Sequence, residues 1–132
     1  AQVARYRATG QLTALTEDNL DQDPYFVYNT LFVNGEPWAT ITDTRQKRND
    51  LRFLSAKAAI GWHVLYNTPY TQKLFDFVQT NLKADAGWYN GFYEASKKPN
   101  RSLTANNNGI ILESLLYKKV GQPLTVWAGV QP

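Results

Sequence analysis

The stretch that decides the fold class is residues 49–82, NDLRFLSAKAAIGWHVLYNTPYTQKLFDFVQTNL, which contains two helix patterns in succession. In the first pattern, Asn49 or Asp50 can cap a helix whose apolar stripe runs from Leu51 to Leu65. We expect this helix to end near residue 66. Its small residues would let neighbouring helix axes approach closely, as in a helix packed between others.

The second pattern begins two residues later. Thr68 is suited to the N-cap and Pro69 to the first helical position, where its missing N–H costs nothing. Leu74, Val78 and Leu82 then recur at helical spacing. Because a short connection favours antiparallel neighbours, the two helices predict an αα-hairpin.

A β-hairpin is expected before the helices. Residues 25–33 are rich in aromatic and β-branched side chains, and Asn34-Gly35 is a strong signal for a tight turn. Residues 38–42 would form the return strand, with Pro37 at the strand start or the sheet edge. Residues 1–24 show weak periodicity and predict irregular structure with at most one short helical turn.

The C-terminal third contains a loop and a last helix. Residues 84–105 break the helical pattern, and a third helix is predicted from Asn106 or Asn107 to Lys119, with Gly121 as its left-handed cap. Residues 124–128 predict a strand or an extended arm. The fold class is therefore mainly α with a β-hairpin: three main helices plus long aromatic-rich loops, in a single segment of 132 residues.

Composition excludes several classes of function. The net charge is +3, and the basic side chains concentrate in two short clusters, the first of them flanked by acids, which is unlike a nucleic-acid-binding surface. There is no cysteine, and His63 is the lone histidine, so neither a catalytic triad nor a histidine-based metal site is expected. No glycine-rich phosphate loop and no apolar stretch of membrane-spanning length occurs. We expect no cofactor and no metal.

Carboxylates, aromatic rings and amides remain as candidate functional groups. Glu94 follows the aromatic run that includes Trp88 and Tyr89, where partial desolvation would raise its pKa towards that of a general acid. Glycoside hydrolysis uses such a carboxyl together with a second one, for which Glu17 and Asp21 are candidates. The simpler interpretation of any one acid is a solvated surface charge.

The remaining candidates would bind a sugar. Trp88, Tyr89 and Tyr25 could stack on sugar rings, although burial in the core is the simpler account of any single ring. Three consecutive amides at residues 106–108 exceed what helix capping needs, so Asn106 and Asn108 could bind sugar hydroxyls. We expect these amides and Glu94 to face a common hollow.

Several motifs together resemble the C-terminal part of a known bacterial family. They are LTEDNLD (15–21), PYFVYN (24–29), LSAKAA (54–59), GWYNGFYE (87–94) and TANNNGIILE (104–113), and they resemble the DUF3131 domain in that order. The family looks like the glucoamylase-like (α/α) toroids and occurs in envelope proteins. The resemblance places Glu17, Asp21 and Glu94 in the loops where toroid active clefts lie.

The resemblance also implies a larger protein. A toroid of twelve helices needs about 300 residues at typical helix and loop lengths. The chain begins at Ala1 without a methionine, so we expect either a removed leader or an upstream N-terminal portion that completes the toroid.

Three functional hypotheses follow. The first is part of a carbohydrate-active, glycoside hydrolase-like protein that acts on an envelope or extracellular polysaccharide, in the periplasm or outside the cell. The second is a non-catalytic polysaccharide-binding or assembly module that uses the same aromatic rings. The third is a structural fragment that leaves a large apolar patch exposed when it is alone.

Overall fold

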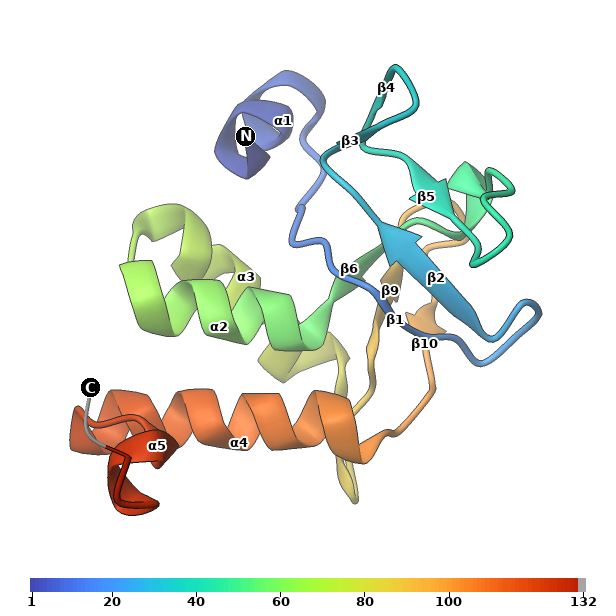
Figure 1. Cartoon of the computed structure of the whole chain (residues 1–132). Coiled ribbons are helices and arrows are strands. Elements are labelled where there is room, and N and C mark those ends of the chain that lie inside the picture. The colour runs from blue at the N-terminus through green and yellow to red at the C-terminus, as the bar shows by residue number, and fades with distance from the viewer. Residues whose placement is uncertain (131–132) are drawn as a thin grey trace.

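The computed structural model describes residues 1–130 and separates helices from strands in space. In Figure 1, α2, α3 and α4 lie together on one side of the molecule, and most of the short strands lie on the other. The elements in chain order are α1 (Gln2–Thr9), β1 (Asp18–Asn19), β2 (Phe26–Asn29), β3 (Phe32–Val33), β4 (Glu36–Pro37), β5 (Thr40–Ile41), the 3-10 turn η1 (Asn49–Leu51), β6 (Phe53–Ser55), α2 (Ala56–Tyr66), α3 (Pro69–Asn81), β7 (Lys83–Ala84), β8 (Gly87–Trp88), β9 (Gly91–Tyr93), β10 (Pro99–Asn100), α4 (Ala105–Val120) and α5 (Leu124–Trp127).

The three main helices predicted from the sequence are confirmed. Helix α2 packs against both α3 and α4. Its face carries Ala59 and Ile60, which are fully buried with Leu74 and Val78 of α3 and Ile111 of α4. This cluster is the main hydrophobic core, and the small side chains of α2 allow it to lie between its two neighbours.

The ends of these helices follow the predicted signals, with one exception. Thr68 caps α3 in a capping box with Thr71 and Pro69 follows it, while Gly121 ends α4 at φ 73°. The predicted start of the first helix at residues 49–50 is wrong. Residues 53–55 instead pair with β9, and the side chain of Ser55 caps α2 by accepting a hydrogen bond from the amide of Ala58.

The predicted β-hairpin is confirmed. Asn34 and Gly35 both have positive φ, as a type I′ turn requires, and β3 pairs with β4 around them. Pro37 lies in that two-stranded edge ribbon, where its missing N–H is tolerated. Further from the turn, β2 pairs with β5.

Two three-stranded sheets include segments for which the sequence predicted irregular structure, a helix or a loop. Strand β1 joins β2 and β5 in one sheet, and β9 lies between β6 and β10 in another. Gly91 makes the second sheet possible, because a Cβ atom there would collide with the carbonyl oxygen of Leu54 and the ring of Phe53. These strands bring residues from distant parts of the chain together.

Both terminal predictions are wrong. Residues 2–9 form α1, although no residue of α1 is fully buried. Its position depends on long-range contacts: Arg5 pairs with Glu94, and the ring of Tyr6 packs on that of Tyr70. Residues 124–127 form the short helix α5 rather than a strand.

The histidine is a core residue. His63 is buried between helices, with its ring on that of Phe75 and its Nε2 atom 2.6 Å from Nζ of Lys118. Burial and the neighbouring ammonium both lower the pKa of His63. Across residues 1–130, none of the helices combines the length and the hydropathy needed to span a bilayer.

Candidate functional site

Glu94, the leading candidate from the sequence, is held by two arginines. Its Oε1 and Oε2 atoms accept hydrogen bonds of 2.6 and 2.8 Å from the guanidinium of Arg5, and Nη1 of Arg52 lies 3.5 Å from Oε2. The carboxylate is 10% exposed. These contacts connect α1 to the end of β9, so the carboxylate links elements of the fold.

Asp21, in the loop after β1, contacts residues at the ends of β9 and β10. Its Oδ1 atom accepts a hydrogen bond of 2.7 Å from the hydroxyl of Tyr93, and its Oδ2 atom accepts one of 2.7 Å from the amide of Arg101. Burial and the bond to Asp21 raise the pKa of the Tyr93 hydroxyl. Both oxygens of Asp21 therefore attach the loop after β1 to the sheet of β9 and β10.

Unlike Glu94, Glu17 is exposed, with 52% of its side chain accessible. Its Oε2 atom accepts a hydrogen bond of 2.7 Å from Thr16, and its Oε1 atom lies 3.4 Å from Nζ of Lys57. Partial burial alone would raise the pKa of Glu17. The hydrogen bond from Thr16 and the charge of Lys57 outweigh that effect, and the net result is a lowered pKa.

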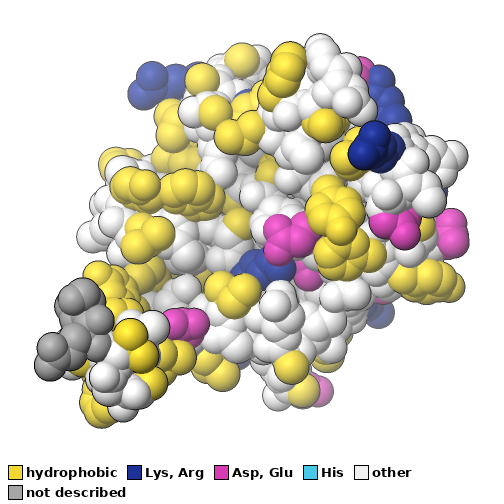
Figure 2. All heavy atoms as spheres, viewed as in Figure 1, with side chains coloured by type: hydrophobic (Ala, Val, Ile, Leu, Met, Phe, Trp, Pro, Cys, Tyr) yellow, Lys and Arg dark blue, Asp and Glu magenta, His cyan; other side chains and the backbone are white. Residues whose placement is uncertain are grey.

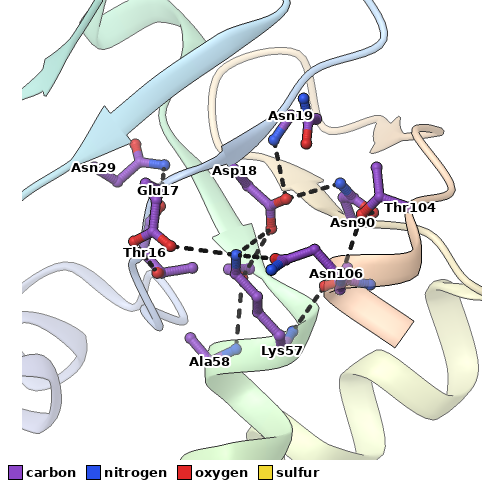
Figure 3. A network of polar contacts seen from close by, with 12 residues as sticks. Thr16, Glu17, Asp18, Asn19, Asn29, Lys57, Ala58, Asn90, Thr104 and Asn106 are labelled. Atoms are coloured by element: carbon purple, nitrogen blue, oxygen red, sulfur yellow. Dashed lines mark hydrogen bonds and ion pairs between the residues drawn. The ribbon is translucent and has the colours of Figure 1, made fainter. Parts of the chain in front are cut away.

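Lys57 is the centre of a buried polar network, which Figure 3 shows in close-up. Its ammonium nitrogen lies 3.0 Å from Oδ1 of Asn106, 3.4 Å from Oε1 of Glu17 and 3.8 Å from Oδ2 of Asp18. The side chain of Lys57 is 6% exposed and that of Asp18 is 1% exposed. Asn90 completes the network by donating a hydrogen bond of 2.8 Å to Oδ1 of Asp18. We call Glu17, Asp18, Lys57, Asn90 and Asn106 the Lys57 cluster.

The carboxyl of Asp18 differs electrostatically from that of Glu17. Burial raises the pKa of Asp18 to about 6, although Lys57 and the amide of Asn19 act in the opposite direction. Two consecutive residues therefore carry carboxyls in contrasting states, one exposed and charged, the other buried and more readily protonated.

Three distant segments hold the cluster in place. The side-chain oxygen of Asn107, near the start of α4, accepts a hydrogen bond of 3.2 Å from the amide of Lys57 at the start of α2. The hydroxyl of Thr104 donates to Oδ1 of Asn90, at 3.3 Å. The N-terminal ends of α2 and α4 thus meet β1, which places the cluster where the helices join the strands (Figures 1 and 3).

Of the remaining predicted residues, the structure brings Asn106 to the cluster and places the others elsewhere. Asn108 bonds to the backbone of Trp88 and Thr104, and so fixes the loop before β9. Trp88 and Tyr89 are half-buried against the main core. Tyr25 is largely exposed just before β2, with φ 66°. The expectation that Glu94 and the amides face one hollow is wrong, because Glu94 faces Arg5.

Sequence reasoning missed Asp18, Lys57 and Asn90. A signal was available for Lys57: it is the lone charge in the segment LSAKAAIG, close to a helix N-terminus, where the helix dipole disfavours a cation. Such a lysine needs a nearby acid, and the acidic pair Glu17-Asp18 supplies one. The contact joins residues 40 positions apart, which no local periodicity reveals.

The Lys57 cluster combines an exposed carboxylate, a buried carboxyl, an ammonium and amides, which donate and accept hydrogen bonds. In the described part of the chain, no group of three or more His, Cys, Asp or Glu side chains is arranged to hold a metal ion.

Comparison with known proteins identifies a family and a related fold. The family described as "Protein of unknown function (DUF3131)" matches residues 1–121. A solved structure of an endo-beta-1,2-glucanase from Chitinophaga pinensis, in complex with sophorotriose and glucose, superposes with a TM-score of 0.54 at 15% sequence identity. The match covers 82% of this chain but 23% of that one, so the likeness is to part of a larger fold. No curated protein matches the chain.

Proposed function

Because the chain belongs to the DUF3131 family, with a match over residues 1–121, we propose that it is part of a carbohydrate-active, glycoside hydrolase-like protein. In this proposal α2, α3 and α4 are part of an (α/α) toroid, and an upstream portion of the same protein supplies the remaining helices. The substrate is an envelope or extracellular polysaccharide, and the protein acts in the periplasm or outside the cell.

The observation that carries this proposal is the contrast between Glu17 and Asp18. Enzymes that use two carboxyls assign them different roles by placing them in different environments, and here the pKa of Glu17 is lowered while that of Asp18 is raised to about 6. Glycoside hydrolysis likewise uses two carboxyls in different roles, although both then reach the sugar. Here Glu17 would contact the sugar, and the buried Asp18 would hold the ammonium of Lys57 beside it.

The likeness to the glucanase suggests which sugar to test first. That protein is described as an endo-beta-1,2-glucanase bound to sophorotriose, so a β-1,2-linked glucan is our first candidate substrate. The candidates Glu94 and Asp21 have a different place in this proposal: their bonds to Arg5 and Tyr93 hold the loops around the Lys57 cluster in position.

One observation favours the alternative function, a non-catalytic polysaccharide-binding or assembly module. Within the Lys57 cluster, the carboxylate of Glu17 is half exposed, whereas the Asp18 side chain is 1% exposed and does not reach a ligand in this conformation. A binding module needs no second carboxyl at the sugar, and the same amides and rings would serve it.

The test compares turnover with binding. The protein, including the upstream portion that the proposal requires, is incubated with β-1,2-glucan, release of reducing ends is measured, and binding of sophorotriose is followed by calorimetry. If Glu17 is catalytic, Glu17→Gln should lower turnover by roughly a hundredfold or more while binding persists. Glu113→Gln, the same substitution on the exposed face of α4, is the matched control and should leave both unchanged.

The other outcomes are equally informative. Binding without turnover in the wild-type protein would favour the binding module. Neither binding nor turnover with β-1,2-glucan or glucans of other linkages would contradict a carbohydrate function altogether.

A further inference from the structure

The register of β1 and β2 sorts their side chains into two faces. Asp18 lies opposite Val27, and Asn19 lies opposite Phe26. Beyond this register, the side chain of Asn29 donates a hydrogen bond of 3.1 Å to the carbonyl of Thr16. Glu17 and Tyr28 lie between these two contacts, on neighbouring segments.

Successive side chains of a strand point to opposite faces, and directly opposed residues share a face. Asp18 and Val27 are both buried on the inner face. The exposed side then carries Glu17, just before β1, and Asn19 of β1, with Phe26 and Tyr28 on β2. One segment supplies two hydrogen-bonding side chains, and its neighbour supplies two aromatic rings.

The two rings form a fixed pair, which we call the aromatic platform. Their centroids are 5.2 Å apart at an interplanar angle of 77°, an edge-to-face contact that holds each ring in position. The Tyr28 residue remains 43% exposed, and Phe26 is half-buried. Figure 2 shows hydrophobic side chains in the middle of this face of the molecule, with acidic and basic side chains directly beside them.

We propose that the aromatic platform is the sugar-stacking subsite of the site assigned above. The apolar C–H face of a hexose ring lies on Tyr28, and its hydroxyls bond to Glu17 and Asn19. This inference rests on the proposed function and specifies how the substrate is held. It assigns stacking to Phe26 and Tyr28, while Trp88 and Tyr89 are packed against the core.

The chemistry of the face selects a saccharide over an apolar partner. A purely apolar surface laid on the platform would also cover Glu17 and Asn19, and burying a charge and an amide without partners is costly. A pyranose avoids that cost, because it has an apolar face for the rings and hydroxyls at its edge for the carboxylate and the amide. Asn106, which is exposed, accepts a hydrogen bond from the buried ammonium of Lys57, the group that also contacts Glu17.

The test is a calorimetric titration of the protein and its ring variants with sophorotriose. Tyr28→Ala should weaken binding about tenfold, and Tyr28→Phe, which keeps the ring, should stay within about twofold of wild type. Phe32→Ala is the matched control. Phe32 is more exposed, at 68%, but it lies on the hairpin ribbon of β3 and β4, outside the β1–β2 face, so binding should not change.

The outcomes separate this inference from the function on which it rests. The platform alone would be overturned if the wild-type protein binds sophorotriose or turns over glucan, and Tyr28→Ala and Phe26→Ala both bind sophorotriose as the wild type does. Absence of saccharide binding and turnover in the wild-type protein would overturn both. A far-ultraviolet circular dichroism spectrum equal to that of wild type establishes that each variant is folded.

Discussion

At the scale of single residues, Asp18 couples stability to pH. Its carboxyl has a pKa of about 6 in the folded chain, against an ordinary value of 3.8. A raised pKa means that the folded state disfavours the charged form. The free energy of unfolding therefore falls as the pH rises above the ordinary pKa, and the full loss is reached above pH 6.

The first prediction concerns Asp18→Asn, which removes this titration. Between pH 4 and pH 7, the wild-type protein should lose free energy of unfolding relative to the variant, by on the order of 2–3 kcal/mol. Urea unfolding of both proteins at several pH values measures the difference. A difference that is constant with pH would show that Asp18 is already charged at pH 4.

The second prediction concerns the buried ion pair of Glu94. Replacing Glu94 with Gln leaves Arg5 and Arg52 without their carboxylate, and both arginine side chains are largely buried. We expect a loss of roughly 2–4 kcal/mol in the free energy of unfolding, because an uncompensated charge remains inside the fold. Denaturant titration measures it.

The control for that prediction is Glu36→Gln. Glu36 pairs with Lys47 in an exposed contact on the hairpin. Exposed pairs contribute below about 1 kcal/mol, so this variant should be close to wild type. Equal losses in the two variants would contradict the assignment of Glu94 as a structural ion pair.

At the scale of elements, the close approach of β9 to β6 depends on Gly91. The third prediction is that Gly91→Ala forces these strands apart, since the added methyl would occupy the positions of the Leu54 carbonyl and the Phe53 ring. We expect a loss of about 3 kcal/mol or more in the free energy of unfolding, at the upper end of overpacking effects.

Gly109 provides the matched comparison within α4. A Cβ atom there meets nothing within 4 Å, and alanine is the better helix former. Gly109→Ala should therefore stabilise the protein by roughly 0.5–1 kcal/mol. Thermal unfolding of the two variants should give shifts of opposite sign, and shifts of the same sign would contradict the proposed clash at Gly91.

At the scale of the whole molecule, the C-terminal helices present an apolar surface. The exposed side chains of α4, α5 and the connection between them include Leu112, Leu116, Tyr117, Val120, Leu124, Val126 and Trp127. Exposed apolar side chains on two successive helices favour association. A large exposed apolar patch is what the structural-fragment hypothesis predicts.

The fourth prediction is that the isolated chain self-associates through this surface. Sedimentation velocity at increasing concentration should show oligomers, and Leu112→Lys together with Trp127→Lys should shift the chain towards the monomer. Phe32→Lys, on the distant hairpin, is the control and should not. A wild-type chain that stays monomeric at high concentration would contradict this prediction.

The sequence by itself determined the features that depend on neighbouring residues. The turn at Asn34-Gly35, the start of α3 at Thr68-Pro69 and the end of α4 at Gly121 were all predicted, because positive φ, capping and a missing N–H are properties of the local backbone. The core stripe of α3 was predicted for the same reason. The family resemblance, carried by short motifs, is also confirmed.

Tertiary structure alone decided which groups meet. Residues 53–55 became a strand because β9 was available to pair with them, and α1 formed where Arg5 could reach Glu94, 89 positions away. The Lys57 cluster joins β1 to the starts of α2 and α4 in the same way. Such contacts depend on how the elements pack, and hydrophobic periodicity carries no information about pairs so far apart in the chain.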